Sequence, residues 1–138
     1  MILLDTHVWI WLVEHDERRL VRRTRSFLER ADARGLLRVS PISFFEVTAL
    51  HVNGSLHLAR PAAQWIQESL ERGNIRIADL TPSIAIDAGH IPATALGDPA
   101  DRFLVATARQ LDATLVTADR AILAYGGAGH VRVHDASR

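Results

Sequence analysis

Four acidic side chains stand where strands are expected to end or helices to begin: Asp5, Glu46, Asp101 and Asp119. Asp5 directly follows the apolar run 2–4, so a central strand would leave it partly buried. An unpaired buried carboxylate is costly and needs hydrogen bonds, a cation or an altered pKa. The chain has no lysine to pair with it, although an arginine would also serve. A divalent metal ion would satisfy several clustered acids together.

Helix capping is the alternative explanation for several acids taken singly. Glu46 completes an S-x-x-E capping box. Asp98 precedes a proline and stands three residues before Asp101, which fits an N-cap followed by an acid in the first turn. Asp119 would cap a short helix. Asp5 has no such explanation, so a joint metal site accounts for the acids better than independent caps.

The ligand chemistry narrows the choice of metal. Carboxylates without any cysteine favour hard ions such as Mg²⁺ or Mn²⁺. The seven histidines form neither an H-E-x-x-H motif nor another close zinc spacing, and most are expected at the surface. His7, two residues after Asp5, is the one nearest to an acid in sequence, and a hydrogen-bonding or core role is favoured for it over ligation.

Apolar spacing and boundary residues divide the chain into alternating strands and helices. A helix is expected directly after Asp5. Strands are expected over 2–4, 36–40, 75–80, 114–117 and 131–133, and further helices over 16–33, 41–52, 61–72, 83–90, 99–111 and 120–123. This alternation predicts a single α/β domain over residues 1–138, with a parallel sheet covered on both faces. Ligands of such sheets bind at the carboxyl ends of the strands, where Asp5, Ser40, Thr117 and Asp119 are expected.

The composition is that of a globular protein, with 48% hydrophobic and 23% charged residues. No apolar run approaches a membrane span, the N-terminus lacks the features of a signal peptide, and the absence of cysteine is compatible with the expected cytoplasmic location. Sixteen arginines balance sixteen acids, so any nucleic acid must meet a local basic patch. Five arginines fall within residues 16–25, which indicates either a solvated helix face or a surface for RNA or a partner.

Four segments carry a resemblance to VapC-type PIN-domain toxins. They are Met1 to Trp9 (MILLDTHVW), Ser40 to Val47 (SPISFFEV), Gly97 to Ala108 (GDPADRFLVATA) and Thr114 to Asp119 (TLVTAD). Each motif is weak alone, but the four occur in the family's order and at similar separations. The resemblance spans nearly the whole chain and implies a PIN-like three-layer fold with a central parallel sheet of about five strands.

The resemblance also implies a function. Asp5, Glu46, Asp101 and Asp119 would be both the catalytic acids and the ligands of Mg²⁺ or Mn²⁺ in an endoribonuclease toxin, with Asp5 and Asp101 as the principal ligands. Thr6, Thr117 and Asp98 would support them, with Asp98 favoured as an N-cap. Arg18, Arg19, Arg22, Arg23 and Arg102 are candidates for contact with RNA or a partner. Leu96-Gly97 stands where related sequences often carry a basic residue or histidine, which puts substrate contacts there in doubt.

The implied partners are an RNA substrate and a small cognate VapB-type antitoxin, and the implied assembly is a homodimer. The antitoxin usually carries the DNA-binding part, which agrees with the neutral charge of this chain and with its lack of a DNA-reading motif. No membrane association is expected.

Other metal-binding α/β classes fit less well. A response-regulator receiver would need a lysine, a haloacid-dehalogenase phosphatase would need D-x-D after the first strand, and no phosphate-binding G-x-x-x-x-G-K-[ST] loop is present. The remaining alternative is a catalytically silent PIN module that binds RNA or protein. Such modules usually lose one or more of the four acids, and this chain has all four.

Overall fold

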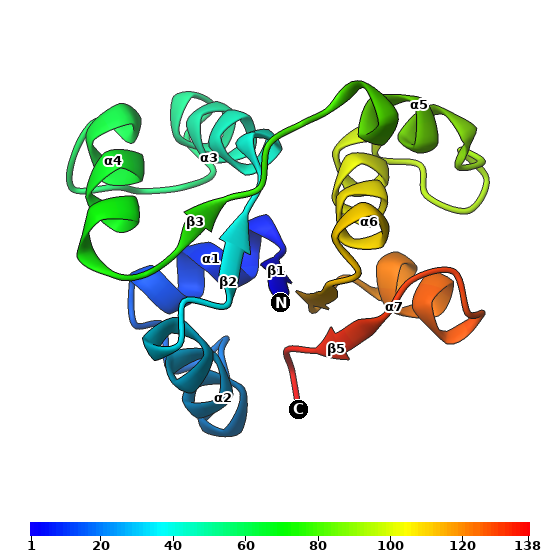
Figure 1. The fold of residues 1–138 in the computed structure, drawn as a ribbon. Helices are drawn as coiled ribbons and strands as arrows, with labels where there is room; N and C mark the ends of the chain where they lie inside the picture. Colours follow the sequence, from blue (N-terminus) through cyan, green and yellow to red (C-terminus); the bar gives the residue numbers. More distant parts are fainter.

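The computed structural model describes all residues from 1 to 138. Its strands are β1 (Ile2–Leu4), β2 (Leu37–Val39), β3 (Arg76–Ile77), β4 (Thr114–Thr117) and β5 (Val133–Asp135). Its helices are α1 (Thr6–Val13), α2 (Arg22–Ala33), α3 (Pro41–Val52), α4 (Ala62–Arg72), α5 (Pro82–His90), α6 (Pro99–Leu111) and α7 (Arg120–Gly127). The alternation of strands and helices expected from the sequence is therefore confirmed (Figure 1).

All five strands form one parallel sheet in the order β3-β2-β1-β4-β5. Strand β1 is central, with β2 on one side and β4 on the other. Leu4 pairs with Val116, and Thr117 pairs with Asp135 on the outer strand β5. Because parallel strands point the same way, the segments that follow β1, β2 and β4 leave the sheet at one edge. That carboxyl edge places Asp5, Ser40 and Thr117 near one another.

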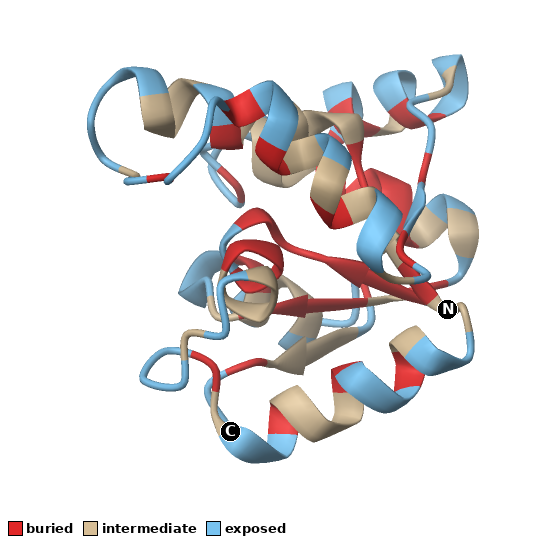
Figure 2. Cartoon of the chain, turned by 90° about the vertical axis from the view of Figure 1, so that its left-hand side faces the viewer, coloured by how far each residue is buried: buried red, intermediate tan, exposed pale blue.

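Each face of the sheet is covered by helices. Ile2, Leu4 and Val116 belong to a core cluster that also contains buried residues of α1, α2, α3 and α4. Leu3 and Leu115, on the opposite face, pack with buried residues of α6 and α7. Figure 2 shows the burial pattern, in which the central strands are buried and the outer sides of the helices are exposed. The expected three-layer α/β fold is confirmed.

Local capping explains where the helices that bear functional residues begin. The Ser40 hydroxyl accepts a hydrogen bond from the Ile42 N–H at 3.1 Å, and a proline at the first helical position supports the start of α3. The Asp98 carboxylate accepts one from the Ala100 N–H at 2.9 Å at the start of α6, as predicted.

Several boundaries differ from the sequence prediction. Helix α2 begins at Arg22 and not at 16, because the Asp16 carboxylate accepts hydrogen bonds from the backbone N–H groups of Arg18 and Arg19 and holds that segment in turns. Strand β3 comprises only two residues. Helix α7 continues to Gly127 and not 123, and β5 begins at Val133, two residues later than predicted. None of the seven helices has the length and apolar character that a membrane span needs.

Candidate active site

The four predicted acids meet in one cavity of about 250 Å³ at the carboxyl edge of the sheet. Its walls are Asp5, His7, Trp11, Glu46, Asp98, Asp101, Ala118 and Asp119. These residues come from the segments following β1 and β4 and from α1, α3 and the start of α6. Asp5 is buried, Glu46 and Asp101 are partly buried, and Asp98 and Asp119 are exposed. The acids therefore run from the floor of the cavity to its rim.

Asp5 forms the floor and is 7% exposed. One carboxylate oxygen accepts a hydrogen bond from the Thr6 N–H at 2.7 Å, and the other accepts one from the Thr117 hydroxyl at 2.6 Å. Burial raises the pKa of Asp5 above its usual value, although these hydrogen bonds oppose the rise. The sequence prediction that Asp5 has no capping role is wrong, since it is the N-cap of α1. The expectation of partial burial is confirmed.

Glu46 lies within α3, so the capping-box interpretation of this residue is wrong. The helix begins at Pro41 with Ser40 as its N-cap, which puts Glu46 a turn beyond the first residues. Its carboxylate instead accepts a hydrogen bond from the hydroxyl of Thr6, whose oxygen also lies 2.8 Å from the Ser43 hydroxyl oxygen. Burial raises the pKa of Glu46, and the nearby charge of Asp5 raises it further.

Asp101 has a strongly altered acidity. Burial raises its pKa to about 8, with further contributions from the negative charges of Asp5, Asp119, Asp98 and Glu46. Its position in the first turn of α6 follows from the cap at Asp98. No cation of the chain makes an ion pair with Asp101 at 4.0 Å or less. The cavity therefore gathers acidic side chains that form no ion pair with any arginine of the chain.

Thr117 connects the acids that follow β1 and β4. Its hydroxyl donates to Asp5 and accepts a hydrogen bond from the Asp119 N–H at 2.9 Å. Asp119 in turn accepts a hydrogen bond from the Ile122 N–H at 3.0 Å and caps α7, as the capping interpretation predicted. Thr117 is fully buried, so one hydroxyl fixes both the buried acid and the backbone of the exposed one.

The residues of the cavity suit a hard divalent cation by their chemistry, since five of the side-chain donors are carboxylates, the other is the His7 imidazole, and no cysteine exists in the chain. Burial raises the pKa values of Asp5, Glu46 and Asp101, and the charges of neighbouring carboxylates raise them further. As they stand, no three acidic or histidine side chains are arranged to ligate one ion. Asp5 and Glu46 instead hold hydrogen bonds from Thr117 and Thr6.

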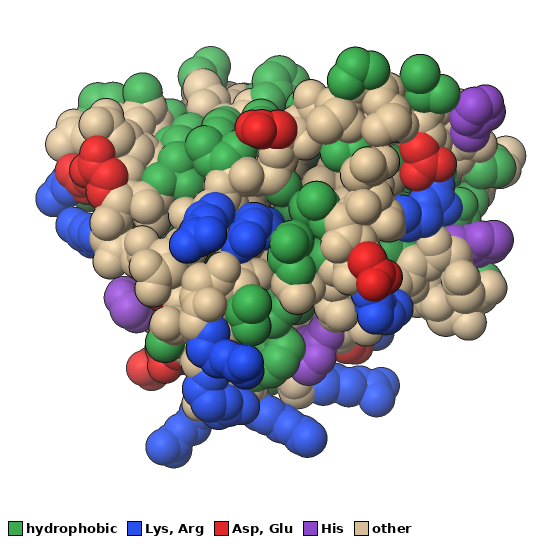
Figure 3. Space-filling view, viewed as in Figure 1, with side chains coloured by type: hydrophobic (Ala, Val, Ile, Leu, Met, Phe, Trp, Pro, Cys, Tyr) green, Lys and Arg blue, Asp and Glu red, His purple; other side chains and the backbone are tan.

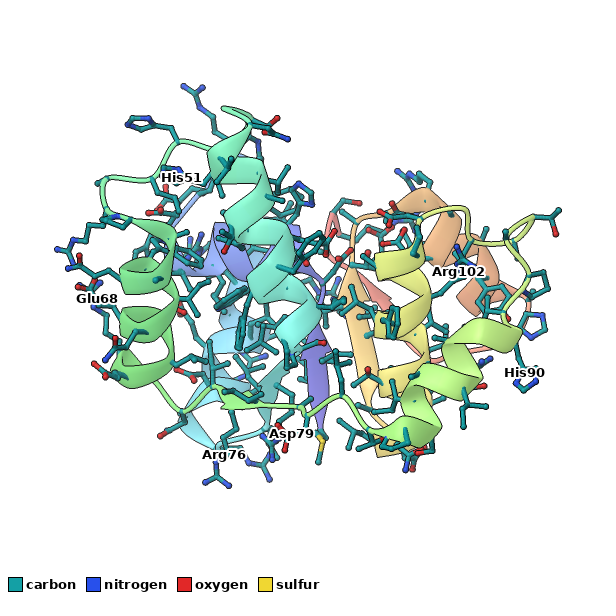
Figure 4. The ribbon with its side chains drawn as sticks, turned by 90° about the horizontal axis from the view of Figure 1, so that it is seen from above. His51, Glu68, Arg76, Asp79, His90 and Arg102 are labelled. Carbon is teal, nitrogen blue, oxygen red and sulfur yellow. The ribbon has the colours of Figure 1, made fainter.

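The other predicted residues lie outside the cavity. Arg102, although it follows Asp101, lies on the side of α6 that faces away from α3 (Figure 4), and its Nε is buried without a hydrogen-bond partner. His51 and His90 are at the periphery of the molecule in the same view, as expected for most histidines. Arg18, Arg19, Arg22 and Arg23 are exposed on the turns before α2 and on its first residues.

Sequence reasoning missed two residues near the acids. Ser43 is fully buried and contacts Thr6, but its place in an apparent capping box concealed this role. Trp11 lines the cavity, and the signal for it was its spacing: it stands four residues after His7 on the helix that Asp5 caps.

Comparison of the sequence with known proteins identifies its family. The model of the PIN domain family matches residues 2–128. Ribonuclease VapC22 of Mycobacterium tuberculosis is 38% identical over 119 residues, which cover 86% of this chain and 87% of that protein.

Solved structures share the fold at lower identity. The DNA-bound VapBC complex of Salmonella typhimurium contains a chain with a TM-score of 0.69 and 17% identity, covering 98% of this chain and 97% of that one. A chain of FitAcB from Neisseria gonorrhoeae has a TM-score of 0.64 and 23% identity, with 99% and 98% covered. The chain therefore belongs to the PIN domain family and is of the VapC type.

Proposed function

We propose that this protein is a metal-dependent endoribonuclease that acts as the toxin of a VapBC-type toxin–antitoxin pair. The observation that carries the proposal is the cavity in which Asp5, Glu46, Asp101 and Asp119 come together from separate parts of the chain. The 38% identity to a protein named a ribonuclease supports the reaction class. The presence of all four acids favours a nuclease over a silent binding module.

The carboxylates would hold Mg²⁺ or Mn²⁺, with Asp5 and Asp101 as principal ligands. A bound divalent ion supplies a hydroxide near neutral pH and stabilises charge on a phosphodiester. The chain's own residues prepare the site. Thr117 and the Thr6 N–H orient the Asp5 carboxylate, and the Thr6 hydroxyl orients Glu46. Because these donors are fixed by the sheet and by α1, they hold the Asp5 and Glu46 carboxylates in defined orientations.

The arginines supply the positive charge that an RNA backbone requires. Figure 3 shows basic side chains gathered at the lower end of the molecule, around α2. A chain of contacts links this end to the acidic edge. The Thr24 hydroxyl of α2 donates a hydrogen bond to the Arg138 carbonyl at 2.8 Å. The Asp135 carboxylate forms ion pairs with the guanidinium groups of Arg138 and Arg120, with N–O distances of 3.6 and 3.9 Å. Arg120 directly follows Asp119. We therefore propose that Arg22 and Arg23, with their neighbours Arg18 and Arg19, contact RNA phosphates.

A VapB-type antitoxin is the proposed protein partner, because solved relatives of the same fold are complexes named VapBC. A homodimer is proposed as the assembly. Exposed apolar side chains support a protein contact, with Phe45 on α3 67% exposed and Ile86 on α5 63% exposed. The proposed location is the cytoplasm, where RNA is available.

The test is a map of new RNA 5′-phosphate ends after brief induction in a host that lacks the antitoxin. Wild type is compared with Asp101→Asn and with Asp79→Asn, a control in which an exposed acid outside the cavity loses its charge. New ends are expected with wild type and Asp79→Asn but not with Asp101→Asn. Identical maps for wild type and Asp101→Asn would refute the nuclease assignment and favour a binding module.

A further inference from the structure

An aromatic pair stands beside the acids. His7 and Trp11 line the same cavity as Asp5, Glu46 and Asp101. They are four residues apart on α1, so they project from the same side of that helix. Their ring centroids are 6.1 Å apart and their planes are tilted by 49°, so the two rings do not stack on each other.

The packing of the core does not account for both rings. Trp9 and Trp65 are the tryptophans of the interior: both are buried, and their rings meet edge to face at 5.0 Å. Trp11 contacts this core only in part and keeps part of its surface exposed at the cavity. His7 is exposed, although its neighbours on either side in the chain are buried. An exposed histidine and a partly buried indole at the mouth of an acidic cavity form a contact surface.

The acids of the cavity restrict which chemical groups can bind to this surface. Five acidic side chains line the cavity, and those that are ionised repel phosphate groups that a metal ion does not neutralise. Within the cavity, contacts to RNA are therefore favoured at groups other than its phosphates. The faces of unpaired bases are such groups, and proteins bind them by stacking aromatic side chains on them.

We infer that Trp11, with His7 beside it, is a stacking surface for an unpaired nucleobase of the RNA next to the cleaved bond. This inference rests on the proposed nuclease function, because it takes RNA as the molecule that enters the cavity. The base that stacks there must be unpaired, since a base inside a duplex has no free face to offer.

The test measures binding and cleavage separately. Binding is measured by anisotropy of a labelled oligoribonucleotide in an Asp101→Asn background with Mg²⁺, so that no cleavage intervenes. A strand of the same length without bases is the comparison ligand. Trp11→Leu removes the aromatic face, and Trp11→Phe retains one. Tyr125→Leu is the matched control. The Tyr125 ring also stacks on a histidine, His130, with ring centroids 4.3 Å apart, but Tyr125 does not line the cavity.

Trp11→Leu should weaken binding of the base-bearing strand by about 5- to 150-fold, the range for loss of one base–aromatic stack. Binding of the strand without bases should be unchanged. Trp11→Phe should recover most of the affinity, and Tyr125→Leu should bind normally. In the protein that retains Asp101, Trp11→Leu should raise KM far more than it lowers kcat. Thermal melts check that every variant is folded.

Two results would overturn the inference: equal losses for both strands, or no loss for either. The nuclease proposal is judged independently by cleavage with wild type and not with Asp101→Asn. Cleavage without base-dependent binding leaves the nuclease and removes the stacking surface. Base-dependent binding without cleavage by wild type would refute the nuclease proposal and, with it, the position of the base next to a cleaved bond.

Discussion

Replacing Asp101 with asparagine should stabilise the metal-free protein near neutral pH while it removes the proposed activity. Asparagine has nearly the shape of the neutral acid and carries no charge at any pH. Partial burial, with a further contribution from the surrounding acids, raises the pKa of Asp101 from its ordinary value of 3.8 to about 8. The folded state therefore holds a proton that the unfolded chain releases readily.

The sign of the effect follows from this difference. The stability that proton binding gives to the folded state is complete below pH 3.8 and is lost as the pH rises to about 8. The two pKa values set an upper limit of about 6 kcal/mol, at about 1.4 kcal/mol per pH unit. Asp101 is partly open to water, which screens the neighbouring charges, so we expect about 1–3 kcal/mol.

The assay is thermal unfolding in EDTA between pH 4 and pH 8. For a chain of this length, that free energy corresponds to a gain of about 3–10 °C in Tm for Asp101→Asn at pH 8. The two proteins should converge near pH 4, where both side chains are neutral. Addition of Mn²⁺ at pH 8 should raise the Tm of wild type more than that of the variant, because the ion provides the missing positive charge.

A gain in Tm that is the same at pH 4 and pH 8 would refute this reasoning, since it would not arise from ionisation. A loss of stability at pH 8 would refute it as well, because it would mean that the Asp101 carboxylate makes a net favourable interaction in the folded protein. Asp79→Asn is again the control, and its Tm should follow that of wild type across the range.

The remaining predictions concern the support of the site and the packing of its edge. Thr117→Val should destabilise the protein by about 1–3 kcal/mol in urea unfolding, because it leaves the buried Asp5 carboxylate without one hydrogen bond. Thr117→Ser, which keeps the hydroxyl, should lose clearly less, and equal losses would contradict a hydrogen-bonding role. Gly126→Ala should cost about 1–3 kcal/mol in the same assay, because the added Cβ would lie 2.5 Å from a Val133 methyl carbon. Gly127→Ala, with open space around its added Cβ, is the control, and an equal loss there would exclude the steric explanation.

Much of the fold was predictable because its signals are local. The run 2–4 is short and apolar, and Pro41 and Pro99 each follow a residue that caps a helix. Such boundaries depend on backbone hydrogen bonds within a few residues, so a single sequence carries them. The predicted start of α2 was wrong because a local apolar pattern also extends through residues that are not helical. Leu20 continues the apolar pattern and is fully buried, yet it belongs to a turn that precedes the helix.

The outer strand shows how pairing can override composition. Residues 131–133 are the apolar part of the last segment and were predicted as the strand. Ladder pairing instead begins at Val133, which aligns with Leu115, and extends to Asp135 opposite Thr117. Register in a sheet is decided by the neighbouring strand, which lies about 18 residues away in the chain.

By itself, the sequence determined which acids could act together, because each stands at a strand end or near a helix start, and a parallel topology brings strand ends to one edge. Only the tertiary structure decided their environments. The Thr6 hydroxyl meets Glu46 across 40 residues, and the Thr117 hydroxyl meets Asp5 across 112. Burial and mutual repulsion then raise the pKa of Asp101 to about 8. These effects depend on distances through space, which cannot be read from the spacing of residues along one chain.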